Sequence, residues 1–103
     1  MLENAGFNKA TEAKLRYARY YAGVLFATNQ LYQKGNDDLV NGLNRLDMEW
    51  ENIRQGQRWA ASLAPNNHIA AELCSRYPDA GVYPLELRQH PNERIQWLQD
   101  ALQ

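Results

Sequence analysis

The chain has 103 residues, a net charge of −1 and a mean hydropathy of −0.69, values typical of one folded domain. No apolar run approaches the roughly 18 residues of a transmembrane helix, which excludes a membrane-spanning protein. The N-terminus carries Glu3 where a secretory leader would have basic residues. The single cysteine, Cys74, excludes an intramolecular disulfide. We therefore expect a cytoplasmic protein with no membrane contact.

The charged residues are distributed unevenly along the chain. Residues 9–34 carry five basic side chains against Glu12 alone, whereas residues 35–63 and 64–103 each have a net charge of −2. A basic helix packed beside acidic helices is the simplest explanation. A basic face that binds phosphate is the alternative.

The first predicted helix spans about residues 11–34. Residues 1–8 show no helical period and are expected to fray, and Thr11 is a suitable N-cap with Glu12 in the first turn. The apolar stripe of this helix recurs at helical spacing through Lys14 (by its aliphatic stem), Tyr17, Ala18, Tyr21, Leu25, Thr28, Leu31 and Tyr32. The stripe indicates one buried face along the helix.

The second predicted helix begins after Gly35, a residue that readily adopts the left-handed backbone at a helix end, and runs to Leu63. Its long apolar stripe consists of Leu39, Leu43, Leu46, Trp50, Ile53, Trp59, Ala60 and Leu63. Two helices of similar length joined by a short turn pack antiparallel, so residues 11–63 predict a long helical hairpin. Gly42 and Gly56 predict a close approach to a neighbouring helix, with a bend as the alternative.

The rest of the chain, about residues 67–103, predicts a layer of shorter helices. Asn67 is expected to cap a helix over 68–77 whose inward side chains are Ile69, Ala70, Leu73, Cys74 and Tyr77. The segment 78–81 is typical of a turn, and 82–89 forms either a short helix from Pro84 or an extended segment. The last helix begins at Pro91 and carries an apolar face of Ile95, Trp97, Leu98, Ala101 and Leu102. The predicted fold is one all-α domain.

Three stretches of the chain match, in the same order, helix patterns that occur together in a known class of proteins. Residues 43–60 approximate L-x-x-L-x-x-E-x-x-N-L/I-R-x-A-x-x-W-A, residues 17–21 are basic and tyrosine-rich, and residues 88–102 approximate R-G-x-x-x-E-x-x-x-W-L-x-x-A-L. Together they resemble the tetratricopeptide-like (TPR-like) region of bacterial signal-transduction ATPases of the NB-ARC (AP-ATPase) class. Gly56 and Gln89 depart from these patterns, which usually have Ala and Gly there.

This resemblance implies a helical scaffold, without enzymatic activity, that binds other proteins or relays a signal in a bacterial signalling or transcription-regulatory system. The phosphate-binding motif G-x-x-x-x-G-K-[ST] of such ATPases does not occur in the sequence.

No residue pattern in the sequence predicts a catalytic, cofactor-binding or metal site. Asp47, Glu49 and Glu51 lie among arginines at ion-pair spacing, which favours a solvated charged face. His68 and His90 stand at helix starts without the acidic or cysteine neighbours of a metal site, so capping or surface roles are expected. Cys74 is expected to be a small core residue. We therefore predict no enzyme and no cofactor.

The main functional prediction is a protein–protein interaction module whose partner is another protein or a second copy of the chain. The candidate partner-binding residues are Trp97, Ile95, Leu98 and Leu102, because the last helix carries an apolar face that nothing downstream covers. The alternative is weak nucleic-acid binding through Lys9, Arg16 and Arg19. A third possibility is an enzyme with a cofactor in a cavity between helices.

Overall fold

The computed structural model describes residues 2–102, with side chains described from Lys9 onward. Within this range the chain forms α1 (Leu2–Lys34), α2 (Asn36–Leu63), the 3₁₀ helix η1 (Ala64–Asn66), α3 (His68–Ala80), α4 (Val82–Arg88) and α5 (Pro91–Ala101). Residues 2–102 contain no strand, which confirms the all-α prediction.

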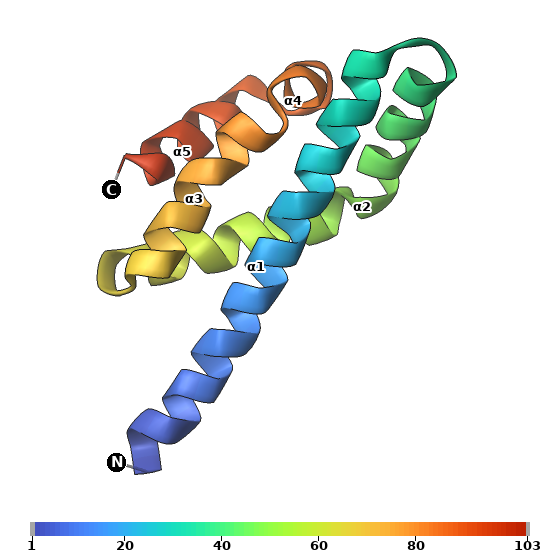
Figure 1. The fold of residues 1–103 in the computed structure, drawn as a ribbon. Coiled ribbons are helices and arrows are strands. Elements are labelled where there is room, and N and C mark those ends of the chain that lie inside the picture. The colour runs from blue at the N-terminus through green and yellow to red at the C-terminus, as the bar shows by residue number, and fades with distance from the viewer. Residues whose placement is uncertain (1, 103) are drawn as a thin grey trace.

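The helices α1 and α2 form the predicted antiparallel hairpin (Figure 1). Gly35 joins them with φ 76° and ψ −175°, a backbone conformation that favours glycine. Beyond the turn α2 crosses behind α1, and α3, α4 and α5 pack back on the hairpin as a shorter layer (Figure 1). The N-terminal part of α1 extends away from the other helices, which gives the molecule an elongated shape of 54 × 22 × 17 Å.

The predicted stripes of the two long helices form the core. Leu25 of α1 and Leu46 and Ile53 of α2 are fully buried, together with Tyr77 of α3 and Leu85 of α4. A second cluster lies beside it and consists of Ala18, Ala60, Leu73 and Cys74. Helical periodicity predicted these faces because a 3.6-residue repeat brings its apolar members to one side.

Tyr77 connects three helices at the centre of the core. Its hydroxyl donates a hydrogen bond of 2.6 Å to the backbone oxygen of Ala18 on α1. Its ring meets the indole of Trp97 on α5 edge-on, with ring centroids 5.6 Å apart. Trp97 in turn lies 5.9 Å from Trp50 of α2, centroid to centroid. Aromatic pairs of this kind add to the free energy gained by burial.

Two glycines of α2 allow close approach of neighbouring helices, as the sequence predicted. A Cβ at Gly42 would lie 2.9 Å from the backbone oxygen of Thr28 on α1. A Cβ at Gly56 would collide with the hydroxyl of Tyr77. Neither position has room for a side chain, so both glycines are required by packing.

The start of α1 differs from the prediction. The helix begins at Leu2 rather than at Thr11, and Thr11 is a buried residue inside the helix rather than its N-cap. The part of α1 before residue 9 extends beyond the other helices (Figure 1), so it has no neighbour to pack on and the sequence needs no apolar period there. The expected fraying concerned residues 1–8, of which Met1 lies outside the described residues.

The α3 helix differs from the prediction at its C-terminal end and in the exposure of Ile69. Asn67 caps it as expected, accepting a hydrogen bond of 3.0 Å from the backbone N–H of Ala70. Ile69, predicted to point inward, is 44% exposed. The helix continues through Pro78 to Ala80, because the buried proline ring offsets the lost backbone hydrogen bond. For residues 82–89 the sequence allowed either a short helix or an extended segment. The structure has the helix α4 there, over Val82–Arg88.

Candidate interaction surfaces

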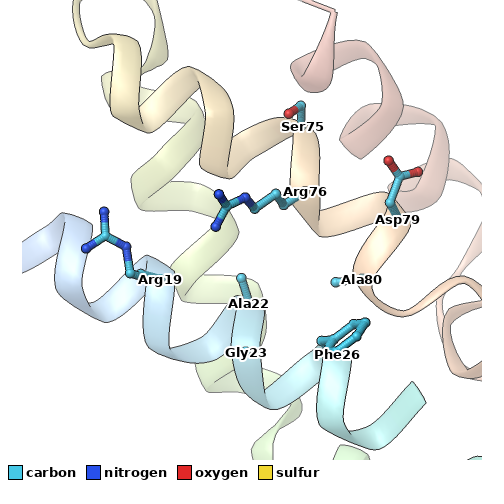
Figure 2. A pocket seen from close by; sticks show the side chains of 8 residues that line it. All are labelled: Arg19, Ala22, Gly23, Phe26, Ser75, Arg76, Asp79 and Ala80. Carbon is cyan, nitrogen blue, oxygen red and sulfur yellow. The ribbon is translucent and has the colours of Figure 1, made fainter. Parts of the chain in front are cut away.

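The main hollow on the surface lies between α1 and α3, which pack side by side. It has a volume of about 480 Å³ and is lined by Arg19, Ala22, Gly23, Phe26, Ser75, Arg76, Asp79 and Ala80. Figure 2 shows Arg19 on α1 and Arg76 on α3 at one end of the hollow, with Phe26 and Asp79 at the other. Its size falls within the range of small-ligand and peptide sites.

A second hollow continues the first along the same two helices. It has a volume of about 200 Å³ and is lined by Glu12, Leu15, Arg16, Arg19 and Ile69. Arg19 borders both hollows, so they form one surface that we call the α1–α3 groove. The groove follows α1 from Glu12 to Phe26 and α3 from Ile69 to Ala80. The two helices run in the same direction along it.

One residue that lines the groove on α1 is an uncovered glycine, Gly23. A Cβ at Gly23 would meet no atom within 4 Å, apart from its own helix backbone and chain neighbours. Gly23 lies in the interior of α1, where glycine is less favourable than alanine by about 1 kcal/mol. Unlike Gly42 and Gly56, this glycine has no packing requirement within residues 9–102.

Large apolar side chains on the two walls are exposed to solvent. Phe26 on α1 is 51% exposed, and Ile69 on α3 is 44% exposed. Leu15 is half-buried and lines the smaller hollow together with Ile69. Apolar side chains gathered in a concave surface are typical of interaction sites.

The three arginines of the groove have no carboxylate partner among residues 9–102. The ion pairs in that range join Arg54 to Glu51 and Glu93, His68 to Glu72, and Arg88 to Asp47. Arg16, Arg19 and Arg76 belong to none of them and are exposed. Their guanidinium groups are therefore free to donate hydrogen bonds to a bound molecule.

The candidate partner-binding residues of the last helix divide into two groups. Trp97 is only 3% exposed and packs between Trp50 and Tyr77, so its indole is part of the core and does not offer a surface to a partner. Ile95, Leu98 and Leu102 are exposed, Leu102 by 87%. Their spacing of three and four residues places them on one stripe of α5.

The residues considered for nucleic-acid binding share one face of α1. Lys9, Arg16 and Arg19 are all exposed, and Arg16 and Arg19 line the groove. Glu12 lies between them in the sequence and lines the same hollow. Its carboxylate reduces the positive potential that phosphate groups would meet.

The two histidines and the cysteine of the chain do not line the groove. His90 caps α5, since its Nδ1 accepts a hydrogen bond of 3.1 Å from the backbone N–H of Asn92. His68 lies at the surface, 3.3 Å from Glu72. Burial raises the pKa of the Cys74 thiol to about 11, with a smaller contribution from Asp100, so the thiol stays protonated at neutral pH. No group of three or more metal-binding side chains occurs among the described residues.

The sequence did not predict that Gly23, Phe26, Arg76 and Asp79 line a common groove. Phe26 carried a signal, because an aromatic residue off the buried stripe of α1 is unusual on a solvated face. Arg76 and Asp79 carried none, since only the packing of α3 on α1 brings them to the groove.

Comparisons with known proteins leave the resemblance to NB-ARC-class ATPases as a prediction. The sequence matches no family model and no curated protein, and the fold matches no solved structure. None of the helices in residues 2–102 combines the length and apolar character that crossing a membrane requires.

Proposed function

We propose that this chain is a protein-interaction module, without enzymatic activity of its own, that binds a helical segment of another protein in the α1–α3 groove. The proposal rests on Gly23, an uncovered glycine of α1 that lines a hollow of about 480 Å³. A glycine there keeps the backbone of α1 open to a close neighbour, as Gly42 and Gly56 do inside the molecule. The groove lies between two parallel walls, which suits an elongated ligand such as a helix.

The energetics of the groove also support a protein ligand. Phe26 and Ile69 lose exposed apolar surface when a partner covers them, and burial of such surface drives association. Aromatic and arginine side chains are favoured at interface hot spots, and the groove contains both kinds, with Arg19 and Arg76 at one end of the larger hollow and Phe26 at the other.

The exposed stripe on α5 is a second candidate surface for the same function. Ile95, Leu98 and Leu102 present apolar side chains outward from the last helix of the shorter layer. A further helix, from another protein or from a second copy of the chain, would cover them in a TPR-like array. A role in bacterial signalling or transcriptional regulation follows only from the resemblance to NB-ARC-class proteins.

A selection of helical peptides on the purified chain tests the proposal. Peptides selected on the unmodified protein are expected to bind Gly23→Leu at least about tenfold more weakly, because the new side chain projects from a residue that lines the groove. The matched control is Asn44→Leu, which adds the same side chain on an exposed position of α2 outside the groove. This control is expected to bind the peptides unchanged.

The same selection distinguishes the two surfaces. Peptides that lose affinity for Leu98→Ser while binding Gly23→Leu normally would place the interaction on α5 and overturn the groove assignment. Recovery of no helical peptide would contradict an interaction module of this kind.

A further inference from the structure

We infer that the α1–α3 groove selects an amphipathic helix whose carboxylates lie near its centre and whose apolar side chains lie on both sides of them. This inference rests on the proposed function and specifies the chemistry of the partner. It follows from the order of charged and apolar residues along the groove.

The positive charge of the groove is concentrated at its middle. Arg16 and Arg19 are less than one helical turn apart on α1, and Arg76 faces Arg19 from α3 (Figure 2). None of the three has a carboxylate partner within 4.0 Å among residues 9–102. A carboxylate placed between the two walls would accept charge-assisted hydrogen bonds from guanidinium groups, which are stronger than neutral ones.

The two ends of the groove carry negative charge instead. Glu12 lines the hollow at one end, and Asp79 lines it beside Phe26 at the other. Carboxylates of a partner would be repelled at either end and attracted at the middle. The charge pattern therefore specifies where the acidic residues of the partner lie.

Apolar surface flanks the arginines on both sides. Leu15 and Ile69 lie toward the Glu12 end, and Ala22, Phe26 and Ala80 lie toward the Asp79 end. A partner helix with apolar side chains before and after its central carboxylates would cover both groups. From Glu12 to Phe26 the groove extends about 21 Å, the length of a helix of about 14 residues.

The same features disfavour a nucleic acid as the ligand. A phosphate backbone carries negative charge along its whole length, so it would meet Glu12 and Asp79 as well as the arginines. Three arginines supply few phosphate contacts, and Phe26 is the one aromatic side chain among the residues that line the groove, whereas single-strand binding stacks successive bases on several aromatic side chains.

Three synthetic helical peptides with the same apolar positions test the inference. The first has carboxylates at its centre, the second has the same residues with the carboxylates moved to its ends, and the third has ammonium groups at its centre. Affinities are measured by fluorescence anisotropy on the full chain. The central-acid peptide is expected to bind at least about tenfold more tightly than either of the others.

Variants of the arginines provide the matched comparison. Arg19→Gln combined with Arg76→Gln is expected to remove most of the preference for the central-acid peptide, with little change in the melting temperature. Arg58→Gln is the control, because Arg58 is exposed on α2 and does not line the groove. It is expected to keep the preference. Circular dichroism of each variant verifies that it is folded.

Each outcome either supports the inference or overturns it. Equal binding of all three peptides, each weakened by Gly23→Leu, would overturn the charge selection and leave the proposed function intact. Binding of none of them, where the library selection yields no helix either, would overturn both. Tighter binding of a single-stranded oligonucleotide, lost in the Arg19→Gln and Arg76→Gln variant, would overturn the inference in favour of a nucleic acid.

Discussion

The two long helices use glycine in opposite ways. On α2, the closed side of this comparison, Thr28 of α1 occupies the space beside Gly42, and the hydroxyl of Tyr77 occupies the space beside Gly56. On α1, the groove side, nothing in residues 9–102 covers Gly23. A helical glycine costs about 1 kcal/mol relative to alanine, and only on the closed side is that cost offset by packing within the chain. This difference is the basis of the proposal that the groove receives another molecule.

The largest expected effect is in the packed core, at Trp97 of α5. Trp97→Ala removes a buried indole that packs on Tyr77 and Trp50, and it is expected to lower the free energy of unfolding by about 3–5 kcal/mol. Leu98→Ala on the exposed face of α5 is the control and should change it by less than about 1 kcal/mol. Urea denaturation followed by circular dichroism measures both. A small effect at Trp97 would contradict its place in the core.

The next effect tests the close approach at Gly56. Gly56→Ala forces a Cβ onto the hydroxyl of Tyr77 and is expected to destabilise the fold by about 1–3 kcal/mol. Adding Tyr77→Phe removes that hydroxyl, so the double variant should be more stable than the sum of the single effects predicts. Additive effects would show that the hydroxyl and the new methyl group do not meet.

A smaller effect separates paired arginines from free ones. Arg54 of α2 bonds Glu93 of α5 at 2.8 Å and Glu51 at 2.9 Å, and both Arg54 and Glu93 are partly buried. Arg54→Gln is expected to lower the free energy of unfolding by about 1 kcal/mol. Arg76→Gln should stay within about 0.5 kcal/mol, because Arg76 has no such pair among the described residues. Equal losses would indicate that Arg76 has a structural role.

The smallest effect has the opposite sign and lies at Gly23. Gly23→Ala should raise the free energy of unfolding by about 0.5–1 kcal/mol, because the helix gains propensity and the methyl group meets no other atom. Gly42→Ala is the matched variant on the closed side and should lower it. Thermal unfolding of the two variants gives the comparison directly. Destabilisation at Gly23 would mean that its open surroundings do not persist in solution.

Helical periodicity predicted the hairpin and its buried faces because each long helix packs one stripe against the other. It failed where packing decides the outcome. The beginning of α1 lacks a stripe and is still helical, and Pro78 lies inside α3 because its ring is buried. The inward face of α5 centres on Trp97, whereas Ile95 and Leu98 on the same predicted face are exposed.

The groove could not be predicted from the sequence, although half of it lies on one helix. Arg16 and Arg19 were identified as an exposed basic pair, and that placement is correct. Arg76 and Ile69 join them in the groove only because α1 and α3 pack side by side in parallel. The residues that meet there are more than fifty positions apart in the chain. Local sequence patterns contain no information on such a pairing.

An NMR titration of the ¹⁵N-labelled chain with a helical peptide selected on it tests the α1–α3 groove as the binding site most directly. Amide shifts are expected to concentrate on residues 12–26 of α1 and 69–80 of α3, on both walls of the groove. Shifts confined to α5, or spread evenly over the surface, would contradict the assignment of the groove as the binding site.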